Sequence, residues 1–250
     1  MSALDAVLLL VGGLVAGVIN SMAGGGSLLT VPLLSIVGVE GLDANGTNRV
    51  AVLVQTLTSG LGFHQAGVRP YRETARLLPP ALVGGLLGAL VVSSIDDEFF
   101  EQVFGVLMIP LLVLALWKPS KAKMAAAAEG PAWPWWLSGL VFFGVGFYAG
   151  AIQAGVGILL LLTLSRSGID LVRGNAIKTI IVVVITAVVA LPVFIAKGQV
   201  EWVPAVVLSI GTGAGGYLGA RVAAHGGERV IKPVLVVSVI GLAGRMIGLY

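Results

Sequence analysis

The stretch "NSMAGGGSLLTVP", residues 20–32, places three consecutive glycines between two strongly apolar segments. A glycine inside a helix costs roughly 1 kcal/mol relative to alanine. Glycine also allows the backbone to turn tightly and to approach a ligand closely. The stretch therefore predicts a break between two helices, at a point where the backbone can approach a ligand.

The segments around this break are too apolar for a soluble domain. The chain of 250 residues is 57% hydrophobic and 11% charged, with a mean hydropathy of +1.02, whereas a soluble domain is about one quarter charged. Five long segments contain no charged residue, namely 77–95, 103–117, 132–165, 179–196 and 202–220. A membrane-spanning helix needs about 20 largely apolar residues. We therefore expect an all-α polytopic membrane protein.

Several classes of protein are excluded or disfavoured by composition. The chain has no cysteine, so it has no disulfide and no thiol chemistry. The apolar run at the amino terminus lacks a basic region and continues into the body of the protein, so we expect no cleavable signal peptide. The net charge of +3 suits a membrane protein with basic loops and does not indicate nucleic acid. We find no nucleophile–base pair and no metal-ligand spacing, and we expect no enzymatic activity, cofactor or metal.

The sequence repeats itself at one offset. "GGLLGA" at residues 84–89 returns as "GGYLGA" at residues 215–220, and 215 − 84 = 131. The same offset relates Gly13 to Gly144, Ala23 to Ala154, Gly24 to Gly155, Gly26 to Gly157, Phe63 to Phe194 and Gly67 to Gly198. An offset that recurs across both halves predicts two structural repeats, 1–117 and 135–250, joined by a linker at 118–134 that we expect in the cytoplasm.

The two halves share one layout. Each begins with a Gly-interrupted apolar segment, 4–39 or 135–165, followed by a polar patch, 40–49 or 166–178. Three ordinary spans follow, at about 48–66, 77–95 and 100–117 in the first half and 178–196, 202–221 and 231–249 in the second. Residues 135–165 are too few for two full spans and a turn, so two half-length helices meeting at mid-depth are expected there. The corresponding segment of the first half, 4–39, is longer and is less decisive about the length of its two helices.

The distribution of basic loops predicts that the halves are inverted. Loops on the cytoplasmic side of a membrane are enriched in Lys and Arg. If each Gly-interrupted segment enters and leaves on one side, every basic loop is cytoplasmic and every poorly basic loop is external. If the segment crosses once, at least one basic loop is forced outside. The basic loops carry Arg69, Arg72 and Arg76; Lys118, Lys121 and Lys123; Arg166, Arg173 and Lys178; and Arg221, Arg229 and Lys232.

Paired, Gly-interrupted segments in inverted halves mark the substrate site of secondary transporters. Half-helix amino termini would direct free N–H groups and positive dipole ends at an anion. The alternative is that the glycines only permit close helix packing, as we expect for Gly84, Gly88, Gly211, Gly215 and Gly219. The candidate binding glycines are Gly24, Gly25, Gly26, Gly155 and Gly157.

A cation and several amides follow each break. "NGTNRV" (45–50) carries Thr47, Asn48 and Arg49, and "RGNAIKT" (173–179) carries Asn175 and Lys178. Arginine offers a planar fork of donors suited to oxyanions, and lysine offers a movable point charge. The alternative for both cations is a side chain that snorkels at the membrane edge.

Three further amides are candidates for substrate contact. Asn20 and Gln153 lie beside the glycines, and Gln55 lies within a span, where hydrogen bonding between helices is the alternative. All 12 acidic residues lie in loops or near span ends, so no buried carboxylate is available for a proton relay. The tryptophans at 133, 135 and 136 are expected at the membrane interface. "GAGGYLG" (213–219) is rejected as a dinucleotide motif because it lies inside an apolar span.

The sequence resembles the sulfite exporter TauE/SafE family of membrane permeases over nearly its whole length. The stretches that carry the resemblance are "AGVINSMAGGGSLLTVPLL" (16–34), "GTNRVA" (46–51), "FHQAGV" (63–68), "GGLLGA", "GFYAGAIQAGVG" (146–157), "GNAIK" (174–178) and "GGYLGARVA" (215–223). The second glycine loop departs from the commoner pattern through Ala154 and Val156.

The resemblance implies transport of small sulfur-containing anions, such as sulfite or organosulfonates, across the inner membrane. The residues alone indicate a secondary transporter with a site that favours anions. The alternatives are an anion channel of the same architecture and a membrane-embedded enzyme or assembly factor. The partners expected are a small anionic substrate and the lipid bilayer, and a homodimer is compatible with the sequence.

Overall fold

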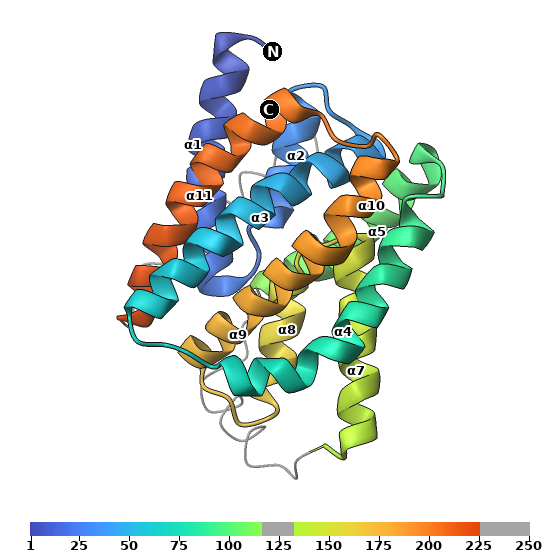
Figure 1. Cartoon of the computed structure of the whole chain (residues 1–250). Coiled ribbons are helices and arrows are strands. Elements are labelled where there is room, and N and C mark those ends of the chain that lie inside the picture. The colour runs from blue at the N-terminus through green and yellow to red at the C-terminus, as the bar shows by residue number, and fades with distance from the viewer. Residues whose placement is uncertain (117–132, 226–250) are drawn as a thin grey trace.

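The structure, a computed structural model, describes residues 1–116 and 133–225, and these residues form helices and their connections (Figure 1). The helices are α1 (Ala3–Ala23), α2 (Ser27–Ile36), α3 (Gly41–Gln65), α4 (Tyr71–Val92), α5 (Asp97–Leu116), α7 (Trp135–Ala151), α8 (Val156–Ser165), α9 (Leu171–Val184), the π-helical turn η1 (Ile185–Ala190), α10 (Leu191–Ala196) and α11 (Trp202–Ala224). Four helical runs, α1, α4, α9–α10 and α11, are long and apolar enough to cross a membrane. The expected all-α, multi-pass membrane protein is therefore confirmed.

Both Gly-interrupted segments are broken where expected. Gly24 ends α1 with a left-handed φ of +81°, and Gly155, with φ +72°, precedes α8. The second helix of each pair has 10 residues, about 15 Å at a rise of 1.5 Å per residue. That is about half of a hydrocarbon core of roughly 30 Å. The first helices are longer, at 21 residues for α1 and 17 for α7, so the expectation of two half-length helices in residues 135–165 holds for α8 and is wrong for α7.

The helices extend beyond the spans expected from apolarity. α3 begins at Gly41 rather than near residue 48, and α4 begins at Tyr71 rather than near residue 77. The polar patches at 40–49 and 166–178 are therefore largely helical and belong to α3 and α9. The expected last span, 231–249, and most of the expected linker lie outside the described residues.

The long helices pack across the two parts of the chain. α11 lies along α1 and α3, and α4 lies along α7 (Figure 1). A Cβ on Gly84 of α4 would lie 2.0 Å from the carbonyl oxygen of Phe143, and one on Gly215 of α11 would lie 2.0 Å from that of Leu14. The repeated "GG(L/Y)LGA" motif is thus a close helix-packing surface, as expected for these glycines.

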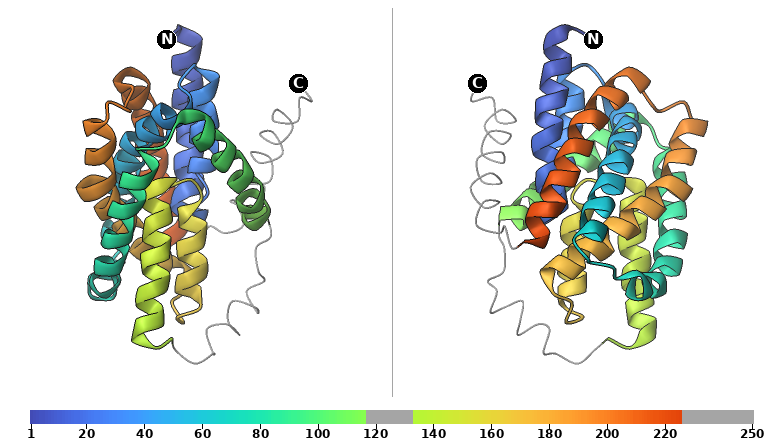
Figure 2. Two further views of the ribbon diagram at one scale, coloured as in Figure 1. Left: turned by 90° about the vertical axis from the view of Figure 1, so that its right-hand side faces the viewer. Right: turned by 60° about the vertical axis from the view of Figure 1, so that its left-hand side comes forward.

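The two broken pairs enter the bundle from opposite ends. Figure 2 shows α1 descending from the amino-terminal end and α2 returning, while α7 rises from the other end and α8 turns back. Large apolar side chains such as Leu86, Val106, Val188 and Ile210 are exposed on the outer faces of the helices, as contact with lipid tails requires. The polar residues after each break are instead directed inward, toward the place where the two pairs meet.

Candidate functional site

The two helix breaks touch each other. A Cβ added to Gly24 would lie 2.3 Å from the carbonyl carbon of Gly157, and one added to Gly157 would lie 2.4 Å from the Cα of Gly24. Real Cβ atoms do not approach backbone this closely, so neither position can hold a side chain in this arrangement. The breaks therefore form one contact between the two parts of the chain.

A small polar cavity lies beside this contact. It has a volume of about 10 Å³, which is roughly the room that one water molecule needs. It is lined by Asn20, Ser27, Val52, Gln55, Thr56, Gln153, Val156, Gly157, Lys178, Thr179 and Val182. Five of the expected site residues, Asn20, Gln55, Gln153, Gly157 and Lys178, are thus brought together from five different elements or breaks.

Lys178 of α9 lies at the carboxyl end of α1. Its side chain is 3% exposed, and its Nζ donates to the carbonyl oxygen of Asn20 at 2.5 Å and to Oδ1 of Asn175 at 2.8 Å. Asn175 also donates from Nδ2 to the carbonyl of Met22 at 3.1 Å. The last carbonyls of a helix carry partial negative charge. Lys178 therefore compensates the partial negative charge at the carboxyl end of α1, and it also lines the cavity.

Arg49 of α3 occupies the corresponding place at the carboxyl end of α7. Its side chain is fully buried. Nη1 donates to the carbonyl of Ala149 at 3.1 Å, and Nη2 donates to those of Gly150 at 2.5 Å and Ala151 at 3.0 Å. The guanidinium also lies 4.3 Å from the ring centroid of Phe194, a cation–π contact. Arg49 does not line the cavity.

The two cations thus cap each other's broken helices. The carbonyl reached by Lys178 is that of Asn20, and Arg49 reaches that of Ala151, and 151 − 20 = 131, the offset of the sequence repeat. Asn45, four residues before Arg49, donates to the same Ala151 carbonyl at 2.8 Å. Neither cation snorkels at a membrane edge, because both charged ends are inside the protein.

The amides near the first break form a network between α1 and α3. Asn20 donates from Nδ2 to Oε1 of Gln55 at 2.6 Å, and Gln55 donates from Nε2 to the hydroxyls of Ser21 at 2.9 Å and Ser59 at 2.8 Å. The N–H of Gly26 donates to Oδ1 of Asn20 at 3.3 Å. Both polar atoms of Gln55 are therefore used in bonds between helices, which was the alternative to substrate contact.

Gln153 is held in an unusual conformation at the second break. Its φ is +64°, a value that residues other than glycine rarely adopt. The side chain is 1% exposed, and its Nε2 donates to the hydroxyl of Thr186 in η1 at 2.8 Å, while its Oε1 has no partner among the described residues. A hydroxyl can donate or accept, so one polar atom of the amide is left for the cavity whichever way the amide is turned. Strained backbone and π-helical turns both concentrate at functional sites.

Two other expected contacts lie away from the cavity, in the first half of α3. The hydroxyl of Thr47 accepts from the N–H of Glu201 at 2.9 Å, and Oδ1 of Asn48 accepts from the hydroxyl of Thr30 at 2.5 Å. A Cβ on Gly25 would meet Ile158 at an ordinary 3.5 Å. Of the five candidate glycines, Gly157 lines the cavity, and Gly24 is in contact with Gly157 beside it.

Three hydroxyl residues of the cavity were missed by reasoning from sequence, namely Ser27, Thr56 and Thr179. Thr179 directly follows Lys178, and Thr56 directly follows Gln55, so adjacency to a candidate was the available signal. Serine and threonine occur in apolar spans for packing reasons as well, so their presence in a span does not by itself indicate a site.

Comparisons with known proteins point to a family of membrane transporters. Residues 9–246 match the family model described as "Sulfite exporter TauE/SafE". A "probable membrane transporter protein ORF9" of Sinorhizobium sp. is 27% identical over 96% of this chain and 91% of its own length. A "probable membrane transporter protein" of Haemophilus influenzae is 28% identical over 94% and 91%, and the "probable membrane transporter protein YfcA" of Escherichia coli K12 is 26% identical over 90% and 82%. No solved structure gives a significant match. Because the family model covers almost the whole sequence, this chain belongs to the sulfite exporter TauE/SafE family.

Proposed function

We propose that this protein is a secondary transporter that carries small sulfur-containing anions, sulfite or organosulfonates, across the inner (plasma) membrane. Transport proceeds by alternating access between two inverted halves. The family and the names of its relatives support a membrane transporter. The cavity at the two helix breaks supports an anionic substrate and alternating access, and the family supports a sulfur-containing anion.

The observation that carries the proposal is a pair of free backbone donors at the cavity. Ser27 and Gly157 line it, and their N–H groups have no acceptor in the described ranges 1–116 and 133–225. They belong to the first turns of α2 and α8, where N–H groups are left unpaired and the helix dipole is positive. Anions bind at such helix ends.

The side chains around these donors have the same preference. Lys178 is the one charged side chain among the described residues that line the cavity, and no carboxylate of those residues accompanies it. Thr56 and Thr179 add hydroxyls, and Gln153 adds an amide with an unused polar atom. We therefore assign anion contact to Lys178, Gln153, Asn20 and the amides of the two breaks, and we assign Arg49 to the capping of α7.

The size of the cavity supports alternating access. A volume of about 10 Å³ holds about one water and excludes a sulfur oxyanion. The arrangement therefore corresponds to a closed site, and the helices around it must separate before an anion can bind. Broken helices at the interface of inverted repeats are the usual site of such rocking.

The test is flux of radiolabelled sulfite into liposomes that contain the purified protein. We expect saturable uptake in the wild type and loss of most uptake in Lys178→Ala and Gln153→Ala, with Arg76→Ala, an exposed cation outside the cavity, as the matched control. Thermal unfolding of each variant shows whether lost uptake reflects lost fold. Wild-type uptake in a folded Lys178→Ala variant would remove Lys178 from the site, and absence of uptake of sulfite and of every sulfonate tried would refute the proposed substrate class.

A further inference from the structure

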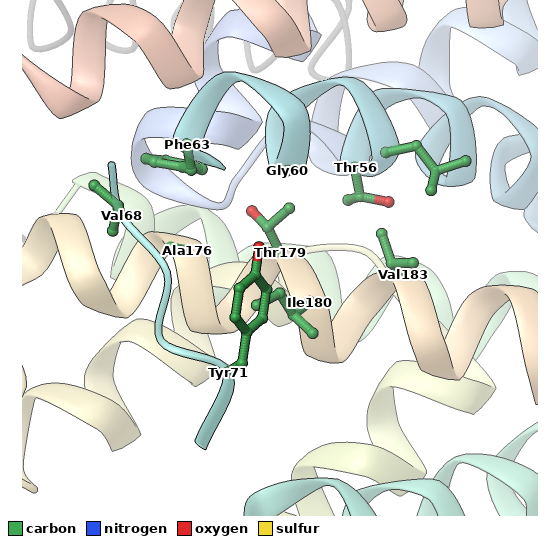
Figure 3. A pocket seen from close by; sticks show the side chains of 10 residues that line it. Thr56, Gly60, Phe63, Val68, Tyr71, Ala176, Thr179, Ile180 and Val183 are labelled. Atoms are coloured by element: carbon green, nitrogen blue, oxygen red, sulfur yellow. The ribbon is translucent and has the colours of Figure 1, made fainter. Parts of the chain in front are cut away.

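A second, larger cavity lies directly beside the central one. It has a volume of about 180 Å³ and lies between α3 and α9, close to the loop that joins α3 to α4 (Figure 3). Its lining residues are Thr56, Leu57, Gly60, Phe63, Val68, Tyr71, Ala176, Thr179, Ile180 and Val183. We call it the α3–α9 cavity.

The two cavities share a wall. Thr56 and Thr179 line both of them, one from each helix (Figure 3). The two hydroxyls are not bonded to each other. Thr56 donates to the carbonyl of Val52 at 2.6 Å, and Thr179 donates to that of Asn175 at 2.9 Å, each within its own helix. The partition is therefore held by packing alone, and a small separation of α3 and α9 would join the two cavities.

The α3–α9 cavity leads toward a basic surface. Val68 also lines a surface depression of about 350 Å³ whose other residues include Arg69, Arg173 and Asp170. Arg173 forms an ion pair with Glu73 at 2.6 Å. The α3–α4 loop, the start of α4 and the end of α8 also carry the exposed Arg69, Arg72, Arg76 and Arg166. We call these arginines the basic rim, and by the positive-inside rule we expect it to face the cytoplasm.

The corresponding region on the opposite side is packed shut. Phe194 and its repeat counterpart Phe63 are both buried, but Phe194 also carries the Arg49 guanidinium 4.3 Å from its ring centroid. A Cβ on Gly46 of α3 would lie 1.8 Å from the carbonyl oxygen of Gln199, so backbone lies directly against backbone there. The N–H of Glu201 is bonded to the Thr47 hydroxyl in the same region. Separation on this side would have to break these buried contacts.

We propose that the α3–α9 cavity is the cytoplasmic vestibule of the anion pathway, and that Thr56 and Thr179 form the gate between this vestibule and the central cavity. This inference rests on the proposed transport function. Access of a reagent to the α3–α9 cavity from the cytoplasm can nevertheless be measured without any transport. The closed central cavity and the sealed opposite side together correspond to a conformation whose next step is opening to the cytoplasm.

The vestibule is tested by single-cysteine accessibility, for which the chain, with no cysteine of its own, needs no background substitution. Ile180→Cys places a thiol in the α3–α9 cavity, and Ile210→Cys, on the exposed outer face of α11, is the lipid-facing control. Arg72→Cys, in the exposed basic rim, reports the cytoplasmic face. A membrane-impermeant, negatively charged thiol reagent is applied to inside-out and to right-side-out membrane vesicles.

We expect Ile180→Cys to react in the same vesicles as Arg72→Cys and not in vesicles of the opposite orientation, while Ile210→Cys reacts in neither. Failure of Ile180→Cys to react where Arg72→Cys reacts, or its reaction only from the other face, overturns the vestibule. The gate is tested with Thr179→Phe and Thr56→Phe, which should abolish sulfite flux, while thermal unfolding shows that each variant is folded. Normal flux through both bulky variants overturns the gate. If Ile180→Cys labels as expected but the wild type moves no sulfur anion, the proposed function is refuted and the vestibule stands.

Discussion

Replacement of Arg49 by alanine separates its two conceivable roles, as a clamp between helices and as a ligand of the anion. In the structure its guanidinium donates to three carbonyls at the end of α7 and stacks on Phe194. None of the described acceptors around it is a carboxylate. The alanine variant removes the Arg49 donors from all three carbonyls, of which only that of Ala151 keeps another donor among the described residues, Asn45. It also opens a void the size of the lost side chain.

The magnitude follows from the number of bonds and the cost of burying the charge. Hydrogen bonds from a charged donor contribute about 1.5–3 kcal/mol each, but part of this sum is offset because the variant no longer buries a cation, whose desolvation costs several kcal/mol. We expect a net loss of about 3–5 kcal/mol, similar to breaking a buried ion pair. For a chain of this size that corresponds to a decrease in Tm of about 10 °C.

The assay is thermal unfolding in detergent, followed by tryptophan fluorescence, together with the concentration dependence of flux in liposomes. A clamp predicts a lower Tm and fewer active molecules with little change in KM for the anion. Arg49→Lys should recover part of the Tm, because a single ammonium can reach fewer of the carbonyls, and Arg76→Ala should leave Tm unchanged. The reasoning is refuted if the Tm of Arg49→Ala falls by less than about 2 °C while its KM rises strongly, since that is the behaviour of a ligand.

Three further outcomes follow from the packing. Gly24→Ala should abolish flux by forcing the two breaks apart, since its Cβ would meet Gly157 at 2.3 Å. The control Gly144→Ala, with nothing within 4 Å of its Cβ, should keep flux and gain up to about 1 kcal/mol of helix stability. Equal flux in both variants would contradict the contact between the breaks. Gly215→Ala should lower Tm because its Cβ would meet the Leu14 carbonyl at 2.0 Å, and an unchanged melting curve would show that α11 can shift freely. A cysteine at the exposed Ser94 should react with an impermeant reagent only from the outside, and labelling from the cytoplasm would reverse the assigned orientation.

The helix breaks and most helix positions could be predicted from the sequence because they depend on local chemistry. The glycines at 24–26 and 155–157 and the charge-free runs are visible in the chain itself. The start of α3 was missed because spans were defined by apolarity, and its first turns carry polar residues such as Asn45 and Thr47 that are buried against other parts of the protein. Propensity and hydropathy describe a segment in isolation, whereas burial depends on its neighbours.

The candidate site was predicted in part, for a similar reason. Lys178, Gln153 and Asn20 were identified from their position beside the breaks, and all three line the cavity. The sequence could not show that Arg49 reaches the carbonyls at 149–151, because that contact depends on how α3 crosses α7 and on which carbonyls the break leaves free. Counting residues from a span end likewise places both cations near a membrane edge. In the structure the short helices α2 and α8 begin inside the bundle, so the cations are surrounded by protein at that depth rather than by lipid.

The reciprocal capping of the two broken helices also constrains how the protein is made. A nascent chain that has been synthesised only to residue 116 carries Arg49 without the Ala149 to Ala151 carbonyls, and the carboxyl end of α1 without Lys178. The bare arginine must then stay at the membrane surface or within the insertion machinery until the later segments emerge. Separately expressed fragments should therefore be degraded when alone and become stable when produced together, since each supplies the donor for the free carbonyls at the end of the other's broken helix.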